Sequence, residues 1–71
     1  MGITKLRYKL LQDGRKQYEI AHDSGVYASR IAEYATGRRA IPAHHQIALA
    51  ESLHCNPEDI VGNVELLETD G

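Results

Sequence analysis

Four residues in the second half of the sequence are of the types that bind metals or act as nucleophiles: His44, His45, His54 and Cys55. Zinc sites need a Cys-x₂-Cys or His-x₃₋₅-His spacing, and neither occurs here. Adjacent histidines on a helix are expected to point in different directions, and a buried free thiol at Cys55 would behave as a small hydrophobic residue. A reactive Cys–His pair would also need a cleft, an orienting group and an oxyanion site, which nothing in the sequence supplies. We therefore expect no metal, no cofactor and no enzymatic activity.

The basic residues form the second group with recognisable chemistry. All eight Lys and Arg residues lie within the first 39 positions, which contain four acidic residues and therefore sum to +4. From residue 40 onward the chain has six acidic residues and no basic ones. This division favours a protein with one positive side that faces a polyanion and one negative side that faces solvent or repels the polyanion. Two ordinary solvated surfaces of opposite charge would give the same pattern.

The size of the chain limits what can position these groups. Its 71 residues make one small domain that buries only about 60% of the unfolded surface. The single cysteine excludes an internal disulfide and suits a reducing compartment. We find no apolar run of about 18 residues and no signal-peptide pattern. We expect a soluble, cytoplasmic protein without a membrane segment or a deep cleft.

Apolar residues recur at helical spacing, whereas the period-2 alternation of strands is scarce. A first helix is expected to contain Ile3, Leu6 and Leu10 and to end at Gly14. A second fits residues 16–24, and a third lies between 25 and 37. Residue 42 is a proline suited to the first turn of a fourth helix, and the sequence NPED at 56–59 starts a fifth.

These elements predict an all-α, compact bundle of five short helices over residues 1–62, followed by a short acidic C-terminal tail over 63–71. His54 stands at the end of the fourth helix, where a helix-ending glycine is common. Beyond the first helix, the inward-facing residues are expected to be Ile20, Ala21, Val26, Ile31, Tyr34, Ile47, Leu49, Ala50, Leu53, Ile60 and Val61.

Residues 16–36 have the pattern of a helix-turn-helix, in which a short helix, a tight turn containing glycine and a second helix follow one another. Gly25 supplies the positive φ that such a turn requires. Val26 is expected to fill the core after the turn, and Ile31 and Tyr34 to anchor the second helix from below. This leaves one outward-facing set: Tyr27, Ala28, Ser29, Arg30 and Glu33.

From about Leu6 to Gly62 the sequence resembles the lambda-repressor-like helix-turn-helix family (phage repressor/Cro type, XRE). The resemblance lies in KQYEIAHDSGVYASRIAEYATGRRAIP at 16–42 and LAESLHCNPEDIVG at 49–62. A Gln opening the second helix, an apolar–Ala pair, Gly-hydrophobic, Ser-x-Ile, Gly-x-Arg and Pro follow in order. In such proteins the third helix enters the DNA major groove and the second crosses the backbone.

The resemblance implies that base edges are read by residues at the start of the third helix. Ala28 would contact a thymine methyl group, Arg30 could reach guanine, and Glu33 could accept from cytosine N4. The base-facing set is Tyr27, Ala28, Ser29, Arg30 and Glu33, and the phosphate-contacting set is Lys16, Gln17, Thr36, Arg38 and Arg39.

The resemblance therefore implies a sequence-specific, DNA-binding transcriptional regulator of prokaryotic or phage type, acting most simply as a nucleoid-associated repressor. One module reads about half a site, so a homodimer on double-stranded DNA is expected. Its dimer interface would involve Ile60, Val64, Leu66 and Leu67. The alternative is an antitoxin or protein-interaction module of the same fold, whose acidic C-terminal half would bind a basic protein partner.

Overall fold

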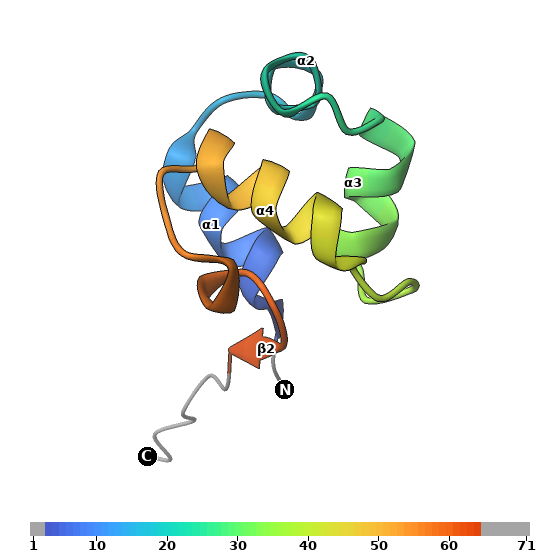
Figure 1. Ribbon diagram of the computed structural model, residues 1–71. Coiled ribbons are helices and arrows are strands. Elements are labelled where there is room, and N and C mark those ends of the chain that lie inside the picture. The colour runs from blue at the N-terminus through green and yellow to red at the C-terminus, as the bar shows by residue number, and fades with distance from the viewer. Residues whose placement is uncertain (1–2, 65–71) are drawn as a thin grey trace.

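The computed structural model describes residues 3–64, which form four α-helices, one short 3₁₀ helix and a two-stranded antiparallel sheet (Figure 1). The elements are β1 (Ile3–Thr4), α1 (Lys5–Asp13), α2 (Gln17–Ser24), α3 (Ala28–Ala35), α4 (Ala43–Ser52), η1 (Pro57–Asp59) and β2 (Asn63–Val64). Among the residues described, no helix combines the length and the hydropathy needed to cross a membrane.

The four α-helices confirm the helical reading of residues 5–52, but two parts of the prediction are wrong. The expected fifth helix is only the three-residue turn η1, which ends at Ile60, where the N–H bonds back to the Pro57 carbonyl at 3.1 Å. Ile3 lies in a strand, because Thr4 is extended and caps α1 by accepting a hydrogen bond from the Arg7 N–H. The molecule is therefore mostly helical with a small sheet, in which Ile3 pairs with Val64 and Thr4 with Asn63.

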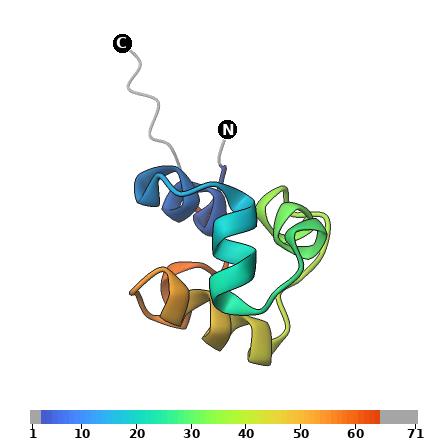
Figure 2. The same ribbon diagram turned by 90° about the horizontal axis from the view of Figure 1, so that it is seen from above.

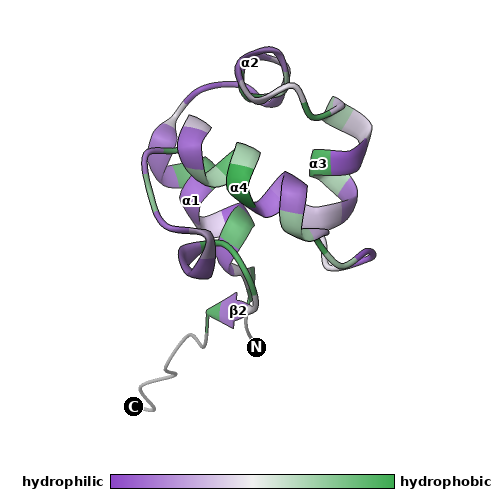
Figure 3. Ribbon diagram, in the orientation of Figure 1, coloured by the Kyte–Doolittle hydropathy of each residue, from purple (hydrophilic) through white to green (hydrophobic). Residues whose placement is uncertain are grey.

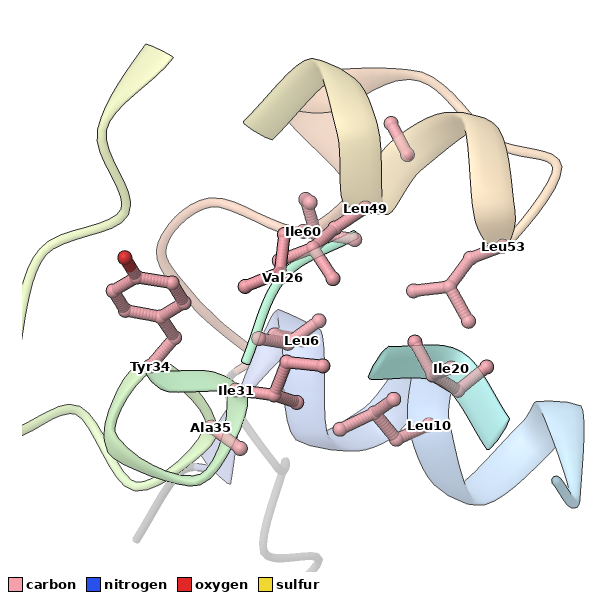
Figure 4. Close-up of a cluster of buried hydrophobic side chains, with 11 residues drawn as sticks. Leu6, Leu10, Ile20, Val26, Ile31, Tyr34, Ala35, Leu49, Leu53 and Ile60 are labelled. Atoms are coloured by element: carbon pink, nitrogen blue, oxygen red, sulfur yellow. The ribbon is translucent and has the colours of Figure 1, made fainter. Parts of the chain in front are cut away.

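The core lies where the four α-helices and Ile60 meet (Figure 4). Residues of both hydropathy classes occur on α1, α3 and α4, as expected for short helices that bury one face each (Figure 3). The buried apolar set is Leu6, Leu10, Ile20, Val26, Ile31, Tyr34, Ala35, Leu49, Ala50, Leu53 and Ile60.

Two residues expected to face the core are exposed instead. Ile47 is 55% exposed because it precedes the buried Leu49 by two residues, which places it roughly 200° away around α4. Val61 is 40% exposed. It directly follows the buried Ile60, at which the chain is no longer helical, so the two side chains point to different sides.

Arg15 connects three helices and is used for structure rather than for an open basic surface. Its Nε donates a hydrogen bond of 2.6 Å to Asp13 Oδ2, and its Nη2 donates one of 2.6 Å to the Ser52 carbonyl oxygen. The buried Ser52 donates in turn to Asp23 Oδ2 at 2.7 Å. These bonds lower the pKa of Asp13 and Asp23, chiefly through Arg15 and Ser52 respectively.

Candidate nucleic-acid interface

The pair formed by α2 and α3 is joined by a turn of three residues, 25–27. Gly25 has φ 79°, and its N–H donates to the Ala21 carbonyl at 2.9 Å. The Ser24 hydroxyl accepts from the Val26 N–H at 3.2 Å, and Val26 is 2% exposed, as predicted. Figure 1 shows α2 down its axis and α3 from the side, and Figure 2 shows the reverse, so the two helices cross steeply.

The start of α3 is the exposed part of this pair. Tyr27 precedes the helix and is 80% exposed, and Ala28 and Ser29 are exposed beside it. No side chain caps this end of α3, which leaves its first N–H groups open to a ligand. The same helix is held from the other side by the buried Ile31 and Tyr34, which confirms their predicted packing role.

Glu33 lies between two arginines. Arg30 Nη1 donates to Glu33 Oε1 at 2.9 Å, and Arg39 Nε donates to the same oxygen at 3.1 Å. The pKa of Glu33 is lowered, mainly by the bond from Arg30 and then by the charges of Arg39 and Arg30. Glu33 is therefore an ionised carboxylate that fixes two guanidinium groups.

The end of α3 sets the direction of the basic loop that follows. The Gly37 N–H donates to the Tyr34 carbonyl, and the Arg38 N–H donates to the Glu33 carbonyl at 2.9 Å, which is the Schellman pattern with Gly37 at φ 81°. The Thr36 hydroxyl donates to the carbonyls of Ala32 and Glu33, so its proton is already engaged within α3. Arg38 and Arg39 are exposed.

At the start of α2, Lys16 and Gln17 are exposed. The Lys16 N–H donates to Glu19 Oε1 at 2.8 Å, and the Lys16 ammonium lies 5.8 Å from the centre of the Tyr18 ring. The carboxylate of Glu19 thus satisfies the N–H of the N-cap residue, whereas the Lys16 side chain has no acceptor for the first N–H groups of α2.

The structure brings together three side chains for which the sequence predicted no common site. The Tyr34 hydroxyl lies 2.7 Å from His45 Nδ1, and the rings of His44 and His45 have centroids 4.3 Å apart. The expectation that these histidines point in different directions is therefore wrong. Burial lowers the pKa of His45, and His44 and Arg30 add to this effect. The sequence contained a signal for the closeness of His44 and His45, because a helix that starts at Pro42 places both histidines in its first turn.

Two of the four residues expected at a dimer interface lie within the described part of the chain. Ile60 is 1% exposed and so is not available to a second chain. Val64 is half-buried in β2, where it pairs with Ile3. Leu66 and Leu67 lie outside the described residues.

The remaining candidates for chemistry lie after α4. His54 has φ 55°, the backbone of a helix-ending glycine, as predicted. Cys55 is half-buried, which raises the pKa of its thiol. Within residues 3–64, no three His, Cys, Asp or Glu side chains gather as a metal site would require. No family model, curated protein or solved structure matches this chain.

Proposed function

We propose that this chain is a sequence-specific DNA-binding regulator of the lambda-repressor-like type, with α2 and α3 as its helix-turn-helix. The observation that carries the proposal is the exposed, uncapped start of α3, held from below by a buried face and followed by two exposed arginines. Such a helix fits the major groove, where residues at its N-terminus meet base edges. Occupying an operator in this way would make the protein a repressor.

The residues divide into two roles. Tyr27, Ala28 and Ser29 extend from the start of α3 toward base edges, where methyl groups and hydroxyls meet thymine methyls and polar edges. Gln17 at the start of α2 and the exposed Arg38 contact phosphates on either side. Glu33 contributes through the arginines that it holds, since a carboxylate alone would repel the backbone.

A homodimer on a pseudo-palindromic site is part of the proposal. One α3 of eight residues reads about half a site, and a two-fold pair doubles the contacts. Because Ile60 is buried, the interface would use Val64, Leu66 and Leu67. Sedimentation at tens of micromolar measures this directly, and a monomer at that concentration contradicts it.

The function is tested by selecting bound DNA from a random duplex pool at a stated salt concentration. We expect an enriched, two-fold consensus and an affinity that falls steeply with salt, because each phosphate contact contributes about 0.9 to the slope of log Kobs against log salt. Arg38→Ala with Arg39→Ala should lower that slope and weaken binding to all sequences alike.

Lys9→Ala is the control for Arg38→Ala alone, since it also removes one positive charge but near Cys55 rather than beside α3. In Figure 1 the segment around Cys55 lies on the side of the molecule away from α3. Weak binding with a flat salt dependence and no enriched site would contradict the proposal.

The second candidate is a protein-interaction or antitoxin module with the same fold. It is favoured by one observation, the six acidic and no basic residues after position 39. A basic partner protein would then bind the acidic half, with or without promoter binding. Loss of partner binding on reversing the charges of Glu51 and Glu58, both exposed, would support this candidate.

A further inference from the structure

An open surface pocket between α3, the loop that follows it and the start of α4 has a lining suited to an anion. It measures about 470 Å³, and we call it the α3–α4 pocket. Its lining lies entirely within the described residues and contains no carboxylate; it consists of Arg30, Tyr34, Arg39, Ala40, Ile41, Pro42, His44 and His45. Every ionisable group in this set is either cationic or able to become so, apart from the Tyr34 phenol.

Glu33 positions the two guanidinium groups without entering the lining. It accepts one N–H from Arg30 and one from Arg39 on the same oxygen, at 2.9 and 3.1 Å. Each guanidinium keeps further N–H groups that Glu33 does not engage. One carboxylate and two guanidinium groups leave a net positive charge at the pocket, and the arginines are held in place before a ligand arrives.

The start of α4 adds donors on the other side of the pocket. Pro42 precedes the helix and has no side chain that could cap it. The N–H groups of His45 and Gln46 bond to the Pro42 carbonyl, whereas those of Ala43 and His44 belong to the uncapped first positions. The positive end of this ten-residue helix therefore reinforces the arginines.

The Tyr34–His45 bond gives the pocket a proton-dependent element. When His45 is neutral, its Nδ1 can accept from the Tyr34 hydroxyl at 2.7 Å. When the ring is protonated, Nδ1 must donate, the Tyr34 oxygen accepts, and the Tyr34 O–H is released. Figure 4 shows this hydroxyl directed away from the apolar cluster.

The groups around His45 decide when it is charged. Arg30 and the Tyr34 phenol face it from α3, Arg39 lies across the same pocket, and His44 stands beside it on α4. Burial, and after it the charges of His44 and Arg30, disfavour a proton on His45, and its pKa is accordingly lowered. An anion in the pocket would offset these charges and reverse the preference.

We propose that the α3–α4 pocket holds a backbone phosphate of bound DNA, and that the His44–His45 pair takes up a proton from solvent when the phosphate binds. This inference rests on the proposed DNA-binding function. It adds Arg30, His44 and His45 to the phosphate contacts and makes the affinity for DNA rise as the pH falls.

The first test uses inorganic sulfate, because it keeps the same charge throughout the range in which histidines titrate. The imidazole C–H resonances of the full chain are titrated by NMR in sodium chloride and in sodium sulfate at equal ionic strength. We expect sulfate to raise the pKa of His45, and Arg39→Gln, at an exposed position, to reduce this rise. His22 on α2 serves as the internal reference for general ionic effects. A His45 titration that sulfate leaves unchanged, or changes no more than that of His22, would overturn the proposal.

The second test identifies DNA as the source of the phosphate. The affinity for the selected duplex is measured at pH 8 and pH 6 for the wild type and for His44→Gln with His45→Gln, after circular dichroism has shown the variant to be folded. Uptake of part of one proton should strengthen wild-type binding by about fivefold between these pH values. The variant should show little pH dependence.

The two tests together distinguish a failure of the backbone-phosphate assignment from a failure of the proposed DNA-binding function. Equal pH dependence in wild type and variant, despite a sulfate effect, would show a pocket for free anions only and overturn the backbone-phosphate assignment. Absence of DNA binding at either pH would instead overturn the proposed function, while the sulfate titration would still decide whether the pocket binds anions.

Discussion

Thr4 shows how one hydroxyl can hold two helices together. It accepts from the Arg7 N–H at 3.1 Å at the start of α1 and donates to the Ala35 carbonyl at the end of α3. Thr4→Val keeps the shape but loses both bonds, so we expect the free energy of unfolding to fall by about 1–2 kcal/mol in urea denaturation. Thr4→Ser retains both bonds and should lose clearly less. Equal losses for the two variants would contradict this role.

His45 makes the stability depend on pH in the absence of anions. Its lowered pKa means that the unfolded chain takes up a proton near the ordinary value of about 6.5, whereas the folded chain takes it up only at lower pH. Stability should therefore decline as the pH falls below about 6.5. The thermal midpoint measured in chloride at pH 7 and 5.5 should drop less for His45→Gln than for the wild type. The pKa values of the carboxyl groups of Asp13, Asp23 and Glu33 are also lowered. Protonation of these groups at still lower pH should reduce the stability further.

For single residues, the sequence predicted which apolar side chains are buried better than it predicted which polar side chains bond to one another. Ile31 and Tyr34 were placed correctly because their helical spacing reports which face is buried, and Val26 because it directly follows the glycine of the turn. The roles of Glu33 and His45 could not be predicted in the same way. They depend on where long side chains from separate segments meet, here the loop after α3 and the first turn of α4.

Among the elements, the end of α4 carries backbone strain that can be relieved. His54 has φ 55°, and the Cys55 N–H donates to the Ala50 carbonyl across it at 2.9 Å. His54→Gly removes the left-handed penalty at the cost of a more flexible unfolded chain, so we expect a net gain of about 0.5–1 kcal/mol in unfolding free energy.

His22→Gly is the matched control, because His22 lies in the last turn of α2 with a helical backbone. There the same replacement should destabilise the protein by about 0.5–1 kcal/mol. Opposite signs for the two variants, measured by chemical denaturation, would establish that the backbone conformation is responsible. A loss at both positions would contradict it.

The helices were predictable because each has its own local signals, such as Gly14 and Gly25 at helix ends and Pro42 at a helix start. The sheet was not, since its two strands have two residues each and lie at opposite ends of the described chain. No local sequence pattern predicts a pairing between such short and distant segments. The expected fifth helix failed for a related reason: the capping signals of NPED were real, but they start a turn that ends after three residues.

At the scale of the whole molecule, the basic residues divide into structural and exposed ones. Arg15→Ala removes the bonds that join α1 to the end of α4, and we expect it to lower the unfolding free energy more than an exposed arginine does, within one cooperative transition. Arg38→Ala, at an exposed position, should change stability by less than about 0.5 kcal/mol.

Under the proposed function, DNA affinity should respond in the opposite order. Arg38→Ala should weaken DNA binding, whereas folded Arg15→Ala should bind nearly as the wild type does. Denaturation and fluorescence anisotropy on the same two variants measure both properties. Parallel losses in stability and affinity would contradict the division of the basic residues into two classes.

The pairing of β1 with β2 also has a consequence for the order of folding. It joins residues 3 and 64, so it closes a loop that contains nearly all of the described chain. Closing so large a loop is entropically costly until the helices have already brought its ends together. We therefore expect the ladder to be among the last contacts to form and the first to open, without loosening of the core beneath it, and hydrogen exchange of the Lys5 N–H compared with that of core amides measures this. The pairing of β1 with β2 would therefore stabilise a core that has already formed, rather than help to form it.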